Sequence, residues 1–244
     1  MKNPLDELQS IVDRTTASKD SLKVLEAGCG SLSNIRLGPN VYIVGLDVSP
    51  EQLAKNRAVH HKILADLEAC ELPASEYDVI VCWDVLEHLG RPLGVLRKFF
   101  AAIKHDGLII LAFPNVLSLK GLVAKYTPFR FHTLVSRFVY GTRVGSPGYE
   151  VCPTILRYSI APNAIARYAA RHGCDIPFAQ VFESGMQRKF RERCGLVKTR
   201  WWLFRTLVTL LTFGCVDAEG TDCIMVLRPS PSSLRLPTPG ARES

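Results

Sequence analysis

The sequence predicts an α/β protein built on a parallel β-sheet, and three observations carry this prediction. The 244 residues are 47% hydrophobic and 22% charged, values that are ordinary for a globular domain and that exclude a disordered or fibrous chain. Short β-branched runs alternate with helical patterns up to residue 113, as in βαβ units. A turn with two glycines directly follows the first of these runs.

Seven apolar runs are predicted as strands, at residues 22–25, 41–46, 62–64, 77–82, 108–113, 178–182 and 222–227. Between the second and third runs, Ser49 is a predicted N-cap and Pro50 the first residue of a helix. A second helix presents the apolar residues Leu93, Leu96, Phe100 and Ile103 on one face, and residues 105–107 form a predicted turn before the fifth strand. A third helix spans residues 161–172 and ends at Gly173.

The chain divides into a helix over residues 1–20, a domain over residues 21–228 and a disordered tail over residues 229–244. Residues 114–158 interrupt the domain, because prolines and glycines there leave only short amphipathic pieces, at 117–125 and 131–140. This segment is predicted to be a cap inserted after strand five. Long insertions after the carboxyl end of a strand usually carry function.

The sequence also predicts a cytoplasmic protein. Its first twenty residues contain no apolar signal-peptide core. The eight cysteines are scattered, with no CxxC pair and no zinc-type spacing, so we expect reduced thiols. No uncharged apolar run approaches the length of about 18 residues that a membrane span needs.

The two-glycine turn is the most informative segment. Gly28 and Gly30 would let a ligand approach the backbone where a Cβ atom would intrude. Asp47 follows the second strand, at a position where a carboxylate accepts both hydroxyls of a ribose. Asp66 follows the third strand and is placed to hydrogen-bond an adenine amino group. Both a nicotinamide dinucleotide and S-adenosylmethionine fit the ribose ligand.

Two residues favour S-adenosylmethionine over the dinucleotide. Ser33 stands where a dinucleotide loop has its third glycine. Glu26, at the mouth of the loop, would repel a pyrophosphate but attract the ammonium and sulfonium groups of S-adenosylmethionine.

The motifs Glu26-Ala-Gly28-Cys-Gly30, Gly45-Leu-Asp47-Val-Ser49-Pro50, Ala65-Asp66-Leu67 and Tyr77 to His88 occur in order, within residues 22–115. As a set they resemble the class I S-adenosylmethionine-dependent methyltransferases, especially the small-molecule branch. The resemblance implies a Rossmann-like sheet of seven strands, the last antiparallel, with helices on both faces. It also implies cofactor-binding roles, which fall on Glu26, Gly28, Cys29 and Gly30 in the first loop, Asp47 and Val48 after strand two, Asp66 and Leu67 after strand three, and Trp83 in strand four.

One position departs from the family pattern. The family loop commonly has a third glycine two residues after the second, and here that residue is Leu32. This departure is the sequence support for an alternative, a non-catalytic methyltransferase-like module that binds a partner or a membrane surface.

Candidate chemistry follows strand four. His88 could accept a proton from a hydroxyl or amine during methyl transfer, or it could simply cap the next helix. Ubiquinone-pathway O-methyltransferases have a similar cluster, so Asp84, Glu87 and His88 offer an alternative set of ligands for Mg²⁺ or Mn²⁺. The primary prediction has no metal.

The expected acceptor is a small molecule, apolar or lipid-like, that is methylated on oxygen or nitrogen. Tyr126 and His132, both in the insertion, are the candidate substrate residues. Their pattern alone does not identify the acceptor.

A basic and aromatic segment predicts contact with a membrane surface through residues 188–213. Seven Lys and Arg residues lie between positions 188 and 205 against one Glu, and Trp201, Trp202 and a leucine-rich run are next to them. The alternative is a helix packed on the sheet with a solvated basic edge. No reader motif for nucleic acid accompanies the charge, so nucleic acid is not the expected partner. The pattern leaves the oligomeric state open.

Overall fold

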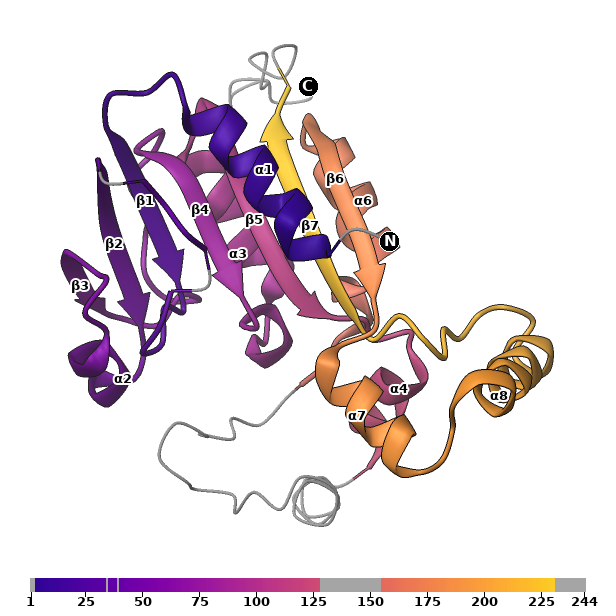
Figure 1. The fold of residues 1–244 in the computed structure, drawn as a ribbon. Coiled ribbons are helices and arrows are strands. Elements are labelled where there is room, and N and C mark those ends of the chain that lie inside the picture. The colour runs from indigo at the N-terminus through magenta and orange to yellow at the C-terminus, as the bar shows by residue number, and fades with distance from the viewer. Residues whose placement is uncertain (1–2, 34, 39, 128–154, 231–244) are drawn as a thin grey trace, which may run out of the picture.

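The computed structural model describes residues 3–33, 35–38, 40–127 and 155–230, and within them seven strands form one sheet in the order β3-β2-β1-β4-β5-β7-β6 (Figure 1). In chain order these are β1 Leu22–Ala27, β2 Val41–Asp47, β3 His61–Leu64, β4 Tyr77–Trp83, β5 Ile103–Pro114, β6 Cys174–Phe182 and β7 Asp222–Pro229. Strands β1 to β5 pair in parallel, whereas β7 runs antiparallel to both β5 and β6. The predicted sheet with an antiparallel last strand is confirmed.

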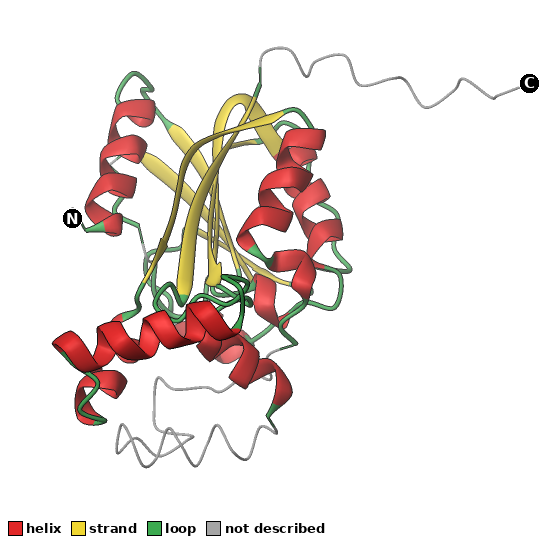
Figure 2. Cartoon of the chain, turned by 90° about the vertical axis from the view of Figure 1, so that its right-hand side faces the viewer, coloured by secondary structure: helices red, strands yellow, loops and turns green. Residues whose placement is uncertain are grey.

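Helices cover both faces of the sheet, as predicted. The described helices are α1 Pro4–Thr16, α2 Pro50–Lys55, α3 Pro92–Ala102, α4 Leu119–Tyr126, α6 Pro162–Arg171, α7 Gly185–Arg193 and α8 Lys198–Leu211, with short 3-10 helices at η1 Leu86–His88 and η2 Tyr158–Ile160, and not all of them lie on the sheet. Figures 1 and 2 show α1 on one face and α3 with α6 on the other.

The side-chain alternation of the strands builds one core on each face. Val24 of β1 packs in the same cluster as Val12 of α1, whereas its neighbour Leu25 packs in the cluster that contains Phe99 of α3 and Ile165 of α6. Successive strand residues point to opposite faces, so a continuously apolar strand feeds both cores. The result is a three-layer arrangement.

Two strands begin at least four residues earlier than the sequence predicted. The expected turn at residues 105–107 lies inside β5, which begins at Ile103 because this residue already pairs with Tyr77. The register between β4 and β5 then shifts before Val79 meets Leu108, so the turn residues are absorbed as an irregularity within the strand. Strand β6 likewise begins at Cys174, and its register shift lies around Pro177. A proline is tolerated there because β6 is an edge strand.

The predicted N-cap at Ser49 is confirmed, since its side chain accepts a hydrogen bond from the backbone N–H of Gln52. Helix α4 confirms the first helical piece of the insertion. The second piece at 131–140, the candidate His132 and the tail over 231–244 lie outside the described residues.

Helices α7 and α8 lie beyond the carboxyl edge of the parallel strands, with α4 beside α7 (Figure 1). Helix α8 therefore does not cover a face of the sheet, which was the structural alternative for the basic segment. Among the described residues, no helix has both the length and the apolar character needed to cross a membrane.

Candidate cofactor and acceptor site

The turn after β1 needs glycine for two reasons. Gly28 and Gly30 have positive φ values, of 73° and 50°, which L-amino acids with a side chain rarely adopt. A Cβ atom on Gly28 would also overlap the side chain of Val85, which follows β4. The N–H groups of Gly28 and Cys29 donate to the carbonyl of Leu46, at 2.7 and 3.1 Å, and this fastens the turn to the end of β2.

Asp47 joins the two loops that would enclose a cofactor. One carboxylate oxygen accepts from the N–H of Gly30 at 2.8 Å, and the other accepts from the N–H of Ser49 at 2.9 Å. Each carboxylate oxygen has a second lone pair, so both can still accept a ribose hydroxyl. The predicted ribose ligand is therefore held in a fixed orientation at the end of β2.

Asn56 is a positioning residue that the sequence reasoning missed. It is fully buried after α2, and its amide nitrogen donates to the carbonyls of Cys29 and Gly30, at 3.2 Å each. Its distance along the chain from the turn concealed this role. The thiol of Cys29 is buried over Gly45, and burial together with the charges of Asp47 and Glu26 raises its pKa to about 12. Cys29 can thus face a cofactor through its backbone, while its side chain belongs to the core.

Glu26 places a buried carboxylate next to the turn. Only 3% of the residue is exposed, and one carboxylate oxygen accepts from the hydroxyl of Ser33 at 2.7 Å. The other oxygen is buried and has no hydrogen-bond partner among the described residues. Burial raises the pKa of Glu26 above its ordinary value, although the hydroxyl of Ser33 opposes the shift. A buried acceptor without a donor is costly, and a cationic ligand would satisfy it.

The residues expected around an adenine line the ends of the neighbouring strands. Val48 is 65% exposed after β2, Asp66 is exposed after β3, and Leu67 beside it is buried. The N–H of Ala65 donates to the carbonyl of Asp47 at 3.0 Å, which ties the β2 and β3 loops together. Trp83 ends β4 on the other side of β1. All the predicted cofactor residues therefore lie at one edge, across the adjacent strands β3, β2, β1 and β4.

Acidic groups gather after β4. Glu87 is 5% exposed on η1, and one of its carboxylate oxygens has no partner among the described residues. Burial, with the nearby charge of Asp84, raises the pKa of Glu87 to about 8. Asp84 has a strained φ of 53° and keeps solvent exposure, yet partial desolvation and the carboxylate of Asp222 raise its pKa, against the opposing charges of Lys120 and His88. The side chains of η1 are thus electrostatically linked to β7.

Asp222 and Lys120 were missed by the sequence reasoning. Because β7 is antiparallel, its first residue pairs with Pro114 at the carboxyl end of β5. Asp222 accepts from the hydroxyl of Thr221 at 2.6 Å and lies 3.5 Å from the ammonium of Lys120 on α4. The predicted antiparallel strand was the available signal, since it brings an amino end to the site.

The metal alternative gains no support from the geometry. Within the ranges that the structure describes, no group of three or more His, Cys, Asp or Glu side chains is arranged to hold a metal ion, and this applies to Asp84, Glu87 and His88 as well.

The acceptor side is bounded by α4 and by the returning end of the insertion. The carbonyl of Glu87 accepts from the N–H groups of Ile155 and Leu156, at 2.8 and 3.2 Å, so this end is fixed against η1. Tyr126 is 70% exposed at the end of α4, and its hydroxyl lies 2.7 Å from that of Tyr158. Tyr126 therefore stands where a bound acceptor could touch it, whereas the companion candidate His132 falls outside the described residues.

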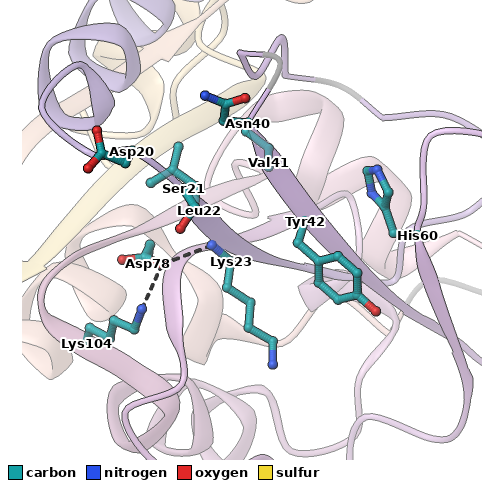
Figure 3. A pocket seen from close by; sticks show the side chains of 10 residues that line it. All are labelled: Asp20, Ser21, Leu22, Lys23, Asn40, Val41, Tyr42, His60, Asp78 and Lys104. Atoms are coloured by element: carbon teal, nitrogen blue, oxygen red, sulfur yellow. Dashed lines mark hydrogen bonds and ion pairs between the residues drawn. The ribbon is translucent and has the colours of Figure 1, made fainter.

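The opposite edge of the sheet also has a hollow, with different chemistry (Figure 3). There the buried carboxylate of Asp78 accepts from the ammonium groups of Lys19 and Lys104, at 2.9 and 2.8 Å, and from the N–H of Lys23 at 2.9 Å. Lys19 also pairs with Asp106 at 2.8 Å, so the ammonium groups of Lys19 and Lys104 are matched by the carboxylates of Asp78 and Asp106. We therefore assign it a structural role.

Comparison with known proteins places this architecture in a family. A family model described as a methyltransferase domain matches residues 3–141. The ubiquinone biosynthesis O-methyltransferase of Leptothrix cholodnii is 28% identical over 116 residues, which cover 43% of this chain and 49% of that protein. A relative from Mycolicibacterium smegmatis, named a probable S-adenosylmethionine-dependent methyltransferase, is 31% identical over 65% of this chain and 63% of its own length. This chain thus spans about half of the first relative and under two thirds of the second.

Solved structures agree on the fold. The YcgJ protein of Bacillus subtilis has a TM-score of 0.54 at 12% identity, with 92% of this chain and 99% of that one covered. Phosphoethanolamine N-methyltransferase 2 of Haemonchus contortus, solved with S-adenosyl-L-methionine, has a TM-score of 0.56 at 15% identity, with 92% and 52% covered. The chain therefore belongs to the methyltransferase domain family and has the class I fold.

Proposed function

We propose that this chain is an S-adenosylmethionine-dependent methyltransferase that acts on an oxygen or nitrogen of a small, apolar or lipid-like molecule. The single observation that carries the cofactor assignment is a buried oxygen of Glu26, which has no hydrogen-bond partner among the described residues and lies beside a turn that needs glycine at position 28. A turn used only as strand–helix punctuation would not bury an acceptor without a donor.

The cofactor supplies an electrophilic methyl group, and the described residues would hold it as follows. Asp47 would accept the ribose hydroxyls, Val48 and Leu67 would flank the adenine, and Asp66 would accept its amino group. Glu26 would accept from the ammonium of the methionine end. The fit is favourable because loops from β1, β2 and β3 are already fastened to one another.

The acceptor class rests on the surroundings of η1. Apolar groups are exposed on the two elements that border this region, since Val123 and Tyr126 of α4 and Ile155 of the returning segment are all at least 44% exposed. An apolar acceptor would cover these groups. His88, on η1, is the proposed proton acceptor, and Asp84 interacts with its charge. Alignment of the two reactants would supply much of the remaining rate.

Calorimetric titration of the full chain with S-adenosylmethionine and S-adenosylhomocysteine, with NADH as control, tests the cofactor assignment. We expect micromolar binding of the first two ligands only. Asp47→Ala should weaken this binding by about 100-fold, since hydrogen bonds to a charged group are lost, whereas the exposed Asp20→Ala should leave it unchanged. A folded chain that binds neither ligand would overturn the proposal and favour the non-catalytic module.

A screen of phenols, quinone precursors and lipids with radiolabelled methyl donor then tests the acceptor class. His88→Asn should lower kcat by about 100-fold with the affinity for S-adenosylmethionine unchanged, which is the usual size of a general-base effect. Unchanged turnover in this variant would remove His88 from the mechanism. Transfer confined to polar acceptors would contradict the apolar substrate class.

A further inference from the structure

Helix α8 is apolar on two sides, and only one of them is covered. On the inner side Trp201 is 8% exposed, stacks with Phe204 at a ring distance of 5.7 Å and lies beneath the guanidinium of Arg191 at 5.1 Å. The ion pair between Arg205 and Glu219 fixes the same side. These contacts attach α8 to the fold.

The outer side presents a stripe of leucines to solvent. Leu203, Leu207, Leu210 and Leu211 have the i, i+4, i+7, i+8 spacing of one helix face and are 56%, 53%, 69% and 71% exposed. Trp202 at 53% and Phe213 at 93% extend the apolar surface at the two ends of the helix. A contiguous exposed patch of this kind marks an interaction site, whereas single exposed leucines need no explanation.

The charges around the leucine stripe are basic. Lys198 and Arg200 are exposed in the first turn of α8, and Arg188 and Lys189 are exposed on α7. Cations at a helix N-terminus oppose the helix dipole, and α8 begins with neither an acidic residue nor a side-chain cap. Folding alone therefore gives no reason for this charge. An anionic surface supplies one, because it offsets the unfavourable field while the leucines are buried.

We propose that the outer face of α8, with the basic residues at its N-terminus and on α7, docks in the interface of an anionic lipid bilayer. At about 1.5 Å per residue its 14 residues would lie along the membrane plane over about 21 Å. Figures 1 and 2 show α8 beside the carboxyl edge of the sheet, which is the edge that carries the Gly28 turn and η1. Docking through α8 thus brings the acceptor side toward the lipid, and a lipid-like acceptor has a short path to the site.

A bilayer fits the patch better than a second copy of the chain does. Two copies that pair through the same face would bring like charges together, and α8 contains no Asp or Glu to neutralise them. An anionic bilayer offers charge complementarity to the basic end and an apolar phase to the leucines. Binding to a membrane surface does not require catalytic activity, so the two can be tested separately.

Cosedimentation of the full chain with vesicles tests the proposal, using phosphatidylcholine alone and a mixture with about 30% phosphatidylserine. We expect binding to the anionic vesicles to be at least tenfold stronger, and to weaken as NaCl rises from 50 to 500 mM because salt screens the charges. Leu207→Ser/Leu211→Ser should reduce vesicle binding by tenfold or more, because two leucines that the bilayer would bury are lost. Leu5→Ser, at an exposed leucine of α1, should not change it.

The contribution of the basic residues to vesicle binding is tested with a variant and a control that change the net charge equally. Lys198→Glu/Arg200→Glu should reduce binding to anionic vesicles by more than tenfold, at about 1 kcal/mol per basic residue near the surface. Arg97→Glu/Arg167→Glu makes the same change in net charge on exposed positions of α3 and α6 and should have little effect. Unchanged thermal unfolding and unchanged affinity for S-adenosylmethionine show that the variants are folded.

Three outcomes would overturn the proposal. The first is a wild-type chain that ignores anionic vesicles at low salt, and the second is leucine and charge variants that bind like wild type. The third is a dimer in sedimentation equilibrium that disappears in Leu207→Ser/Leu211→Ser, with no vesicle binding, which would assign the patch to a second copy.

Discussion

Two edges of the same sheet bury carboxylates in opposite ways. At the amino edge, Asp78 is 6% exposed, and burial by itself would raise its pKa. The ammonium groups of Lys104 and Lys19 and the N–H of Lys23 outweigh burial and hold the pKa below its usual range. At the carboxyl edge, Glu26 and Glu87 are buried to a similar extent, but each has an oxygen with no hydrogen-bond partner in the part of the chain that the structure describes, and the pKa of each is raised.

The difference separates structural charge from charge that awaits a ligand. A carboxylate that the fold neutralises adds to stability, whereas one that the fold buries without a donor reduces it. A protein keeps the second kind where a bound group supplies the missing partner. The carboxyl edge is thus the functional one on electrostatic grounds alone.

We expect the largest effect on cofactor affinity from a substitution in the turn beside Glu26. Gly28→Ala places a Cβ atom against Val85 at a φ of 73°, so we expect loss of S-adenosylmethionine binding by about 100-fold or more. Gly38→Ala in the following loop meets nothing within 4 Å and serves as the control. Calorimetry on both variants gives the answer, and equal affinities would show that the turn does not hold the cofactor.

Glu87→Gln tests whether the carboxyl edge reduces stability. The pKa of Glu87 is raised to about 8 in the folded chain from an ordinary value of 4.5. The stability that protonated Glu87 gives the fold is therefore fully present below about pH 4.5, and it is lost as the pH rises toward 8 and the buried carboxyl ionises. Relative to wild type, the free energy of unfolding of the variant should rise by up to about 1 kcal/mol per pH unit in this window. Urea unfolding at pH 5 and pH 8 measures the gain, and a pH-independent difference would contradict the assignment.

Asp78→Asn tests the opposite edge. We expect a loss of about 3 kcal/mol in the free energy of unfolding at pH 7, because one partner of a buried ionic cluster is removed. The pKa of Asp78 is lowered in the fold, so its stabilisation is present above about pH 4 and vanishes as pH falls below that value. Wild type and variant should therefore converge in acid. S-adenosylmethionine affinity should not change, and a weaker affinity in the folded variant would break the distinction between the edges.

The smallest expected effect sharpens the role of Glu26. Glu26→Gln keeps the shape but removes the charge, so affinity for S-adenosylmethionine should fall by about tenfold. Because the pKa of Glu26 is raised in the ligand-free chain, a cationic ligand should also release protons when it binds. Calorimetry in two buffers of different ionisation enthalpy detects the release, and its persistence in the variant would point to another group.

The sequence predicted what local patterns determine. The strands, the N-cap at Ser49 and the placement of the proposed cofactor residues at four strand ends all follow from short motifs. It did not reveal Asn56 or Asp222, because a hydrogen bond across 27 residues and a pairing of β5 with β7 depend on tertiary contacts. Glu87 was noticed only as a possible ligand, since its burial depends on how η1 meets residues 155 and 156.

The same limit explains the basic segment. Its composition indicated a membrane surface or a helix on the sheet, and only the structure shows that α8 lies beyond the carboxyl edge and not on a face of the sheet. Trp201 and Trp202 are adjacent in sequence, yet one is buried and the other exposed. Neighbouring residues of a helix face different directions, so composition alone cannot say which of the two is available.

The hydrogen bonds of Asp47 also have a kinetic consequence. Its two carboxylate oxygens accept hydrogen bonds from the loops after β1 and β2, and the side chain of Asn56 donates a further hydrogen bond to the first of these loops. Loops that are already fastened to one another have little chain entropy to lose on binding, so these loops need no slow closing step of their own. The cofactor should therefore associate in a single rapid phase, and exchange of spent for fresh methyl donor should be governed by how quickly the product leaves.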